Sequence, residues 1–144
     1  MRLLARREHA ARELRHKLIA KGFPDTLAEA AVERARAEGW QSDARYAEAL
    51  VRTRVEAGYG PLRIEQELAR QGIAPELRAA ALAPFEGEWR ARAEAARRRR
   101  FGAASPKDFR ERARQARFLQ YRGFAPGLVR AVVGDGAGAE EWNE

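Results

Sequence analysis

This sequence of 144 residues has no cysteine, and it contains only two histidines and two serines. The absence of cysteine excludes disulfides and thiolate metal sites. His9 and His16 stand seven residues apart, without a third ligand at metal-binding spacing, so no metal site is predicted. Ser42 and Ser105 are both typical of helix caps, and neither stands in the context of a nucleophilic serine.

Long apolar runs, phosphate-loop patterns and strand patterns are also missing. No segment approaches the ~20 apolar residues that cross a bilayer, and the first residues lack the apolar run of a signal peptide. The glycines of 57–61 do not form a GxxxxGK loop. β-branched residues are sparse and do not alternate with polar ones. We therefore expect a cytoplasmic, all-α protein that is not an enzyme and needs no cofactor or metal.

What the sequence does have is one pattern that occurs three times. A leucine is followed four residues later by glycine and then by an apolar residue, in 18–23, 68–73 and 119–124. Each glycine stands where a helix is expected to end, because glycine adopts the left-handed conformation without a Cβ penalty. The glycines lie 50 and 51 residues apart. A fixed internal period indicates tandem copies of one supersecondary unit.

Apolar periodicity and stop signals divide the chain into nine predicted helices. Residues that suit a first helical turn or an N-cap indicate several of the starts: Pro61, Pro75, Pro106, Pro126, Ser42 and Ser105. The predicted helices are 2–9, 11–21, 25–38, 43–57, 61–71, 75–84, 87–100, 106–122 and 126–133.

The predicted fold class is therefore all-α, with three tandem three-helix repeats in an elongated, curved array. The predicted domains are repeat 1 (1–41), repeat 2 (42–86), repeat 3 (87–134) and a flexible acidic tail (135–144). Trp142 leaves open a second arrangement, in which the tail docks on the body. Stacked helical repeats provide long surfaces for other macromolecules. We expect a monomer.

Positive charge is concentrated in the third predicted repeat. The whole chain has a net charge of +7, whereas residues 87–134 carry 13 basic residues against four acidic ones. This imbalance favours a polyanion or an acidic protein surface as the partner. The alternative is that arginine serves only helix formation and solubility.

Two groups of arginines stand out within this region. Residues 97–100 are four consecutive arginines, which span about 400° of a helix, so at least one must lie near the packed side. Arg110, Arg114 and Arg117 share one predicted helical stripe, beside Phe118 and Tyr121. Arginine interleaved with aromatic residues suits phosphates and base stacking, and it equally suits a carboxylate-rich protein surface. The candidate binding residues, spread over all three repeats, are Arg12, Lys17, Arg63, Arg97, Arg98, Arg99, Arg110, Arg114, Arg117 and Arg122.

The order and spacing of these motifs resemble those of the RecX family of bacterial recombinase regulators. The resemblance covers about residues 3–133. It is carried by RREH at 6–9, ELRHKL at 13–18, KGF at 21–23, DARYA at 43–47, GYGPLRI at 58–64, EL at 67–68, GI at 72–73, RFG at 100–102 and RFLQYRGF at 117–124. One departure is Ala10, where the family commonly has a serine that would form a capping box with Glu13. Its absence implies a local cost of roughly 1 kcal/mol.

The resemblance implies a fold of three tandem three-helix repeats and a specific partner. RecX proteins bind the RecA recombinase, engage the groove of the RecA–DNA filament and reduce its ATPase, strand-exchange and coprotease activities. Many also bind single- or double-stranded DNA directly. The residues themselves leave two alternatives open: a helical DNA-binding protein without a RecA target, since three-helix units resemble helix-turn-helix domains, or a purely structural adaptor.

Overall fold

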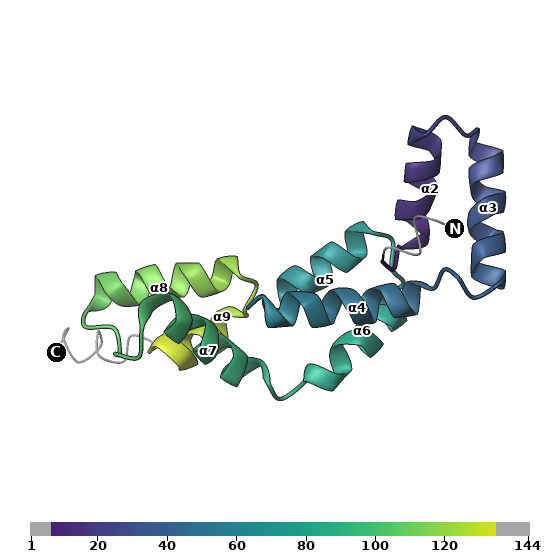
Figure 1. The fold of residues 1–144 in the computed structure, drawn as a ribbon. Coiled ribbons are helices and arrows are strands. Elements are labelled where there is room, and N and C mark those ends of the chain that lie inside the picture. Colours follow the sequence, from purple (N-terminus) through teal and green to yellow (C-terminus); the bar gives the residue numbers. More distant parts are fainter. Residues whose placement is uncertain (1–6, 135–144) are drawn as a thin grey trace. The chain divides into compact units, whose positions relative to one another are not determined.

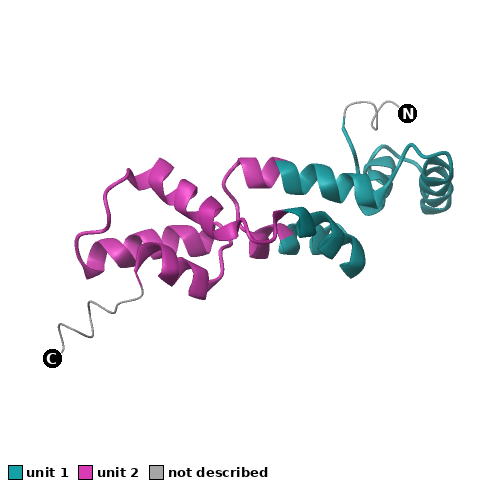
Figure 2. Ribbon diagram, turned by 90° about the horizontal axis from the view of Figure 1, so that it is seen from below, with its two compact units in different colours: residues 1–52, 65–84 teal, residues 53–64, 85–144 magenta. Residues whose placement is uncertain are grey.

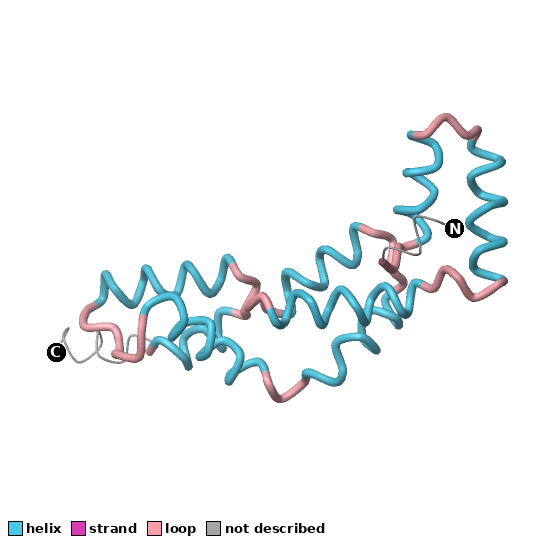
Figure 3. The backbone as a smooth tube through the Cα atoms, viewed as in Figure 1, coloured by secondary structure: helices cyan, strands magenta, loops and turns pink. Residues whose placement is uncertain are grey.

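The computed structural model describes residues 7–134, and every regular element within that range is a helix (Figures 1 and 3). The all-α prediction is confirmed. The elements are α2 (Ala11–Ala20), α3 (Asp25–Ala37), α4 (Asp43–Glu56), α5 (Pro61–Arg70), α6 (Pro75–Leu82), the short 3-10 helix η1 (Ala83–Phe85), α7 (Trp89–Phe101), α8 (Phe109–Tyr121) and α9 (Pro126–Val133).

Two sequence-based predictions fall partly or wholly beyond these limits. The predicted helix 2–9 lies mostly outside the described residues, and its last residues, 7–9, are not helical. The predicted tail 135–144, with Trp142, also lies outside them.

The repeated leucine–glycine pattern has one structural meaning in all three copies. In the first, Phe23 N–H donates to Leu18 O over 3.2 Å and Gly22 N–H donates to Ile19 O over 3.0 Å. These two bonds define a Schellman motif, in which an apolar residue follows a left-handed glycine and contacts the apolar residue near the helix end. The bonds from Gly72 and Ile73, and from Gly123 and Phe124, repeat this arrangement. The predicted glycine stops are confirmed by positive φ angles.

One predicted helix start is wrong. Ser105 and Pro106 indicate a start for the helix that the structure shows as α8, but α8 begins at Phe109. Asp108 is the N-cap, and its carboxylate accepts a 2.8 Å hydrogen bond from Glu111 N–H. Aspartate is as strong a cap as serine, and here it accepts from one of the N–H groups in the first turn that have no partner within the helix.

The described residues form two compact units (Figure 2). Unit 1 contains residues up to 52 together with 65–84, and its core includes Leu14, Ala47, Val51, Leu68 and Ile73. Unit 2 contains 53–64 together with the residues from 85 onward, and its core is formed by Ala93, Leu119, Phe124, Val129 and Val133. Helices α4 and α5 therefore each contribute to both units, while the predicted domain limits stay a prediction.

Two glycines explain why the α4–α5 turn belongs to unit 2. Gly60 N–H donates to Arg122 O over 2.7 Å, and Leu62 N–H donates to Gly123 O over 3.0 Å. A Cβ atom on Gly60 would lie 2.5 Å from Gly123 O, and one on Gly123 would lie 2.5 Å from the Cβ of Arg63. The backbones of the α4–α5 and α8–α9 turns therefore touch at a distance that only glycine permits.

A side chain distant in the sequence takes the place of the serine cap that is missing at Ala10. Ala10 has no side-chain cap, but the Asp43 carboxylate at the start of α4 accepts a 2.9 Å hydrogen bond from Ala11 N–H. The same Oδ1 atom accepts a 2.9 Å bond from Gln41 Nε2. The N-terminus of α2 is thus capped by a residue 32 positions away in the sequence.

We expect Asp43→Ala to destabilise unit 1 by about 1–2 kcal/mol, because the first N–H of α2 loses its acceptor. One of the two N–H donors of the buried Gln41 amide also loses its acceptor, while the amide keeps its 3.1 Å bond to His9 O. Asp43→Asn keeps one oxygen acceptor and serves as the matched control. Chemical denaturation followed by circular dichroism measures both variants. Equal stability of Asp43→Ala and the unchanged chain would show that the cap contributes nothing.

Candidate binding surface

Four arginines and four aromatic side chains alternate across unit 2. Arg63 lies over the rings of Tyr59 (4.5 Å) and Tyr121 (5.0 Å), and Arg122 lies over those of Tyr59 (4.7 Å) and Phe118 (5.0 Å). All distances join the guanidinium carbon to the ring centroid. We call the eight residues the arginine–aromatic ladder; they are Arg63, Arg100, Arg114, Arg122, Tyr59, Phe101, Phe118 and Tyr121.

The ladder continues from Phe118 to the end of α7. Arg100 lies over Phe118 (5.9 Å) and Phe101 (5.3 Å), and Arg114 lies over Phe101 (5.1 Å). Phe101 and Phe118 also meet edge to face, with centroids 5.4 Å apart. Each cation–π contact at an exposed site stabilises by about 0.5–1 kcal/mol, so the contacts hold the guanidinium groups in place without neutralising them.

The docked turns bring the ladder residues together from four places in the chain. Tyr59 follows α4, Arg63 stands in the first turn of α5, and Phe101 ends α7. Helix α8 supplies Arg114 and Phe118 at i, i+4 spacing, and Arg122 follows four residues later as its C-cap. Tyr121, which is 74% exposed, marks the open end of the ladder.

Two ladder arginines also hold the turns through single hydrogen bonds. Arg63 Nη1 donates to Tyr121 O over 3.2 Å, and Arg122 Nη1 donates to Ala57 O over 3.0 Å. A guanidinium has five N–H donors, so one such bond leaves most of its donors for a partner. Cations at helix C-terminal carbonyls are also favoured by the helix dipole.

The structure divides the predicted stripe on α8. Arg114 turns toward α7 and joins the ladder, while its guanidinium also contacts the Glu111 carboxylate at 3.2 Å. The Glu111 carboxylate accepts a hydrogen bond from Gln115 and a further one from Arg114, and these bonds lower its pKa. Arg110 and Arg117 are exposed and lie outside the ladder.

Arg97 is removed from the candidate binding set, because its side chain is only 4% exposed. Its guanidinium donates to both oxygens of Glu94, at 2.7 and 3.3 Å, and to Ala104 O at 3.2 Å. Hydrogen bonds from Arg97 and Arg98 lower the pKa of the Glu94 carboxyl. The expectation that one arginine of 97–100 lies on the packed side is confirmed. Arg98 pairs with Glu94 at the surface, and Arg99 is exposed.

The two candidates in unit 1 are not brought into the ladder. Arg12 Nη1 donates to Arg70 O over 2.9 Å, two residues before Gly72. Arg63 makes the corresponding bond to Tyr121, two residues before Gly123. Arg12 therefore joins α2 to the α5–α6 turn in the way that Arg63 joins α5 to the α8–α9 turn.

Lys17 is half-buried beside His9, which is 2% exposed. Lys17 Nζ lies 3.0 Å from His9 Nε2, and His9 Nδ1 lies 3.1 Å from Arg7 O. Since a carbonyl only accepts and an ammonium only donates, these partners assign the neutral ring with its proton on Nδ1. Burial, followed by the nearby Arg7 and Lys17 charges, lowers the pKa of His9, against opposing contributions from the Arg7 carbonyl and Glu13.

We expect the chain to lose stability as the pH falls below about 6.5, the usual pKa of histidine. Below that value the unfolded chain binds a proton that the folded His9 resists, so stability is complete above this window and declines within it. His9→Gln removes the decline, and His16→Gln, at an exposed position, keeps it. Thermal unfolding between pH 7.5 and pH 5.5 provides the test. The same slope in His9→Gln would assign the titration to another group.

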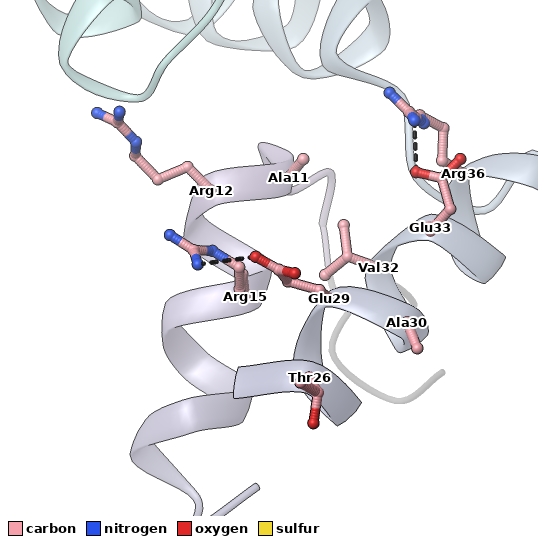
Figure 4. A pocket seen from close by; sticks show the side chains of 9 residues that line it. All are labelled: Ala11, Arg12, Arg15, Thr26, Glu29, Ala30, Val32, Glu33 and Arg36. Atoms are coloured by element: carbon pink, nitrogen blue, oxygen red, sulfur yellow. Dashed lines mark hydrogen bonds and ion pairs between the residues drawn. The ribbon is translucent and has the colours of Figure 1, made fainter. Parts of the chain in front are cut away.

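A hollow of about 590 Å³ lies between α2 and α3 in unit 1. Figure 4 shows Arg15 and Glu29 turned toward each other across it, with 3.5 Å between Nη1 and Oε1, and Arg36 paired with Glu33. Arg12 extends away from them. Arg15 and Arg36 are thus paired with carboxylates, and the described lining contains no histidine that could act as a base toward its one hydroxyl group, that of Thr26.

Within residues 7–134 no three His, Asp or Glu side chains are arranged to hold a metal ion. No helix in this same range is both long and apolar enough to span a bilayer.

The chain is thus an all-α protein, and unit 2 carries a basic surface lined with aromatic side chains. Models of the first, second and third three-helix domains of RecX match residues 1–34, 42–82 and 86–133. The chain belongs to the RecX family.

Individual relatives support the same assignment. Regulatory protein RecX of Xanthomonas axonopodis pv. citri (strain 306) is 48% identical over 131 residues, which are 91% of this chain and 81% of the relative. Regulatory protein RecX of Halorhodospira halophila is 46% identical over 144 residues, covering all of this chain and 88% of the relative.

Solved structures share the fold. A crystal structure of regulatory protein RecX superposes with a TM-score of 0.76 at 23% identity, covering 92% of this chain and 66% of that chain. The crystal structure of RecX from Lactobacillus salivarius gives a TM-score of 0.75 at 17% identity, covering 93% and 89%. The predicted architecture of three three-helix domains is confirmed.

Proposed function

We propose that this chain binds the RecA recombinase, or its filament on DNA, and inhibits its ATPase, strand-exchange and coprotease activities. Family membership and the name regulatory protein, carried by the relatives, support a regulatory role. RecA as the target rests on the family resemblance. The protein acts as a cytoplasmic monomer, without a cofactor.

The arginine–aromatic ladder is the observation that carries this proposal. Its guanidinium groups are held over rings and none is buried. Arg114 is paired with Glu111, so the charges of Arg63, Arg100 and Arg122 are the ones that stay available to phosphates or carboxylates. A recombinase filament presents both kinds of group, from DNA and from acidic protein surfaces. Further exposed arginines extend the basic area, namely Arg99 on α7 and Arg110 and Arg117 on α8.

A second candidate function is DNA binding without a RecA target. Residues 87–134 carry 13 basic residues and four acidic ones, and this imbalance favours direct DNA binding, because a strongly basic surface attracts any polyanion. The two functions differ in one experiment: binding to short single- and double-stranded DNA over a salt series, with and without RecA. Tighter binding to the RecA filament than to bare DNA favours the proposed function, and equal binding favours the alternative.

A further inference from the structure

A cavity of about 210 Å³ lies beside the ladder within unit 2. Its apolar wall is formed by Val55, by Ala95 and Ala96 of α7 and by Phe118 of α8. Gly58 stands at the edge with φ of +91°, and a Cβ atom there would approach Arg122 and Ala96. The absence of that side chain keeps the cavity open.

The rim of the cavity is strongly basic. Four arginines line it, Arg92, Arg99, Arg100 and Arg122, against the single carboxylate of Glu56. Arg92 takes up that carboxylate, with 3.8 Å between Nη1 and Oε1, and also pairs with Glu88 at 3.0 Å. In the described residues neither Arg99 nor Arg100 has a carboxylate partner, and Arg100 lies over the rings of Phe101 and Phe118. Two cations at the mouth are therefore uncompensated.

We infer that this cavity binds one nucleotide, with the base against the apolar wall and the phosphate on Arg99 and Arg100. A base is planar, and both the Phe118 ring and the guanidinium faces of Arg100 and Arg122 over it are stacking surfaces. The phosphate supplies the negative charge that the mouth lacks, through charge-assisted hydrogen bonds. A small carboxylate would bind the arginines at the mouth but would not contact the apolar wall, so a nucleotide fits the cavity better.

The nucleotide has two possible sources with the same chemistry, a free nucleotide or one unit of a single strand. Neither source requires RecA, so the isolated chain binds the nucleotide in both cases. A purely basic surface contacts only phosphates, which are the same in every strand, whereas this cavity also contacts the base. Binding therefore depends on the presence of a base.

Two single strands with equal phosphates test this requirement: a 12-residue oligodeoxyadenylate and a 12-residue strand of abasic sites. We expect the native full-length chain to bind the first about tenfold more tightly, since stacking of one base is worth about that factor. Ala95→Leu fills the cavity without changing charge and is expected to abolish this preference while leaving abasic-strand affinity unchanged. Ala91→Leu, the same change one turn earlier on an exposed part of α7, is the control and is expected to keep it.

Deoxyadenosine monophosphate at millimolar concentration distinguishes the two sources. Displacement of the oligodeoxyadenylate from the native chain assigns the cavity to free nucleotides as well, and a base preference without displacement assigns it to a nucleotide within a strand. Equal affinity of the native chain for the two strands overturns the inference. An equal loss of affinity for both strands in Ala95→Leu also overturns it. A third contrary result is that Ala95→Leu weakens binding to the RecA filament and leaves strand binding intact, because the cavity would then be a protein contact.

Discussion

We expect Gly123→Ala to destabilise this protein by about 3–5 kcal/mol, more than any other single substitution considered. Gly123 has a φ of +100°, a conformation that costs an L-residue about 1–2 kcal/mol. The new Cβ would also stand 2.5 Å from Arg63 Cβ and 2.7 Å from Arg63 N. The second atom belongs to the backbone, so the contact is relieved only by separating the two turns.

Two further glycines separate the effect of the positive φ from the effect of the close contact. Gly22, at the equivalent position of the first repeat, has a φ of +102°, and a Cβ atom added there would meet nothing within 4 Å, so Gly22→Ala tests conformation alone. Gly60 has no positive φ, but its Cβ would lie 2.5 Å from Gly123 O, so Gly60→Ala tests the contact alone. Denaturant unfolding of all three variants gives the comparison. A loss for Gly123→Ala no greater than that for Gly22→Ala would show that the turns are not tightly docked.

The second large effect is expected at the ladder. The double substitution Arg63→Gln and Arg122→Gln should weaken binding to double-stranded DNA roughly 10- to 100-fold near physiological salt, if both guanidinium groups meet phosphates. The slope of log affinity against log salt should fall by about 2. The ring contacts and the bonds to Tyr121 and Ala57 are lost as well, so folding is verified by circular dichroism.

The control for this variant removes the same charge elsewhere. Arg34 and Arg36 of α3 are exposed, and they pair with Glu38 and Glu33. Their double substitution with glutamine should leave both affinity and salt slope close to those of the unchanged chain. If the two double variants lose affinity equally, net charge and not the ladder governs binding.

Much of the fold is encoded locally, and this is why the sequence predicts it. The Schellman motifs at Gly22, Gly72 and Gly123 need only a leucine, a glycine and an apolar residue at fixed spacing. The predicted start of α8 is wrong because two local signals compete: Ser105 with Pro106 and, three residues after Ser105, Asp108. Local pattern alone does not rank caps of similar strength.

The ladder is only partly predictable, because tertiary contacts assemble it. The pattern of α8 identifies Arg114 and Arg122, and Arg63 is a candidate as a basic residue, but nothing local places Tyr59 beside Arg122. That neighbourhood depends on the contact between Gly60 and Gly123, which are 63 positions apart. Arg100 is absent from the predicted site, although its place beside Phe101 at the end of an arginine run is a usable signal.

The sequence also does not predict which of the equivalent positions in the three repeats are buried. Ile73 and Phe124 are 1% exposed, while Phe23 at the same offset is 49% exposed. The residue types are alike, and the difference depends on what covers each position in space. The same reasoning applies to Arg97, whose run of four identical residues does not reveal which one faces Gln115.

The central claim, that this chain regulates RecA through the ladder, is tested most directly by DNA-dependent ATP hydrolysis by RecA from the same organism. The unchanged chain, added at substoichiometric ratio, is predicted to slow hydrolysis, and so is the Arg34/Arg36 control. The Arg63/Arg122 variant, folded by circular dichroism, is predicted to leave hydrolysis largely unaffected. No inhibition by the unchanged chain, with its DNA binding intact, would contradict the account and favour a DNA-binding protein without a RecA target.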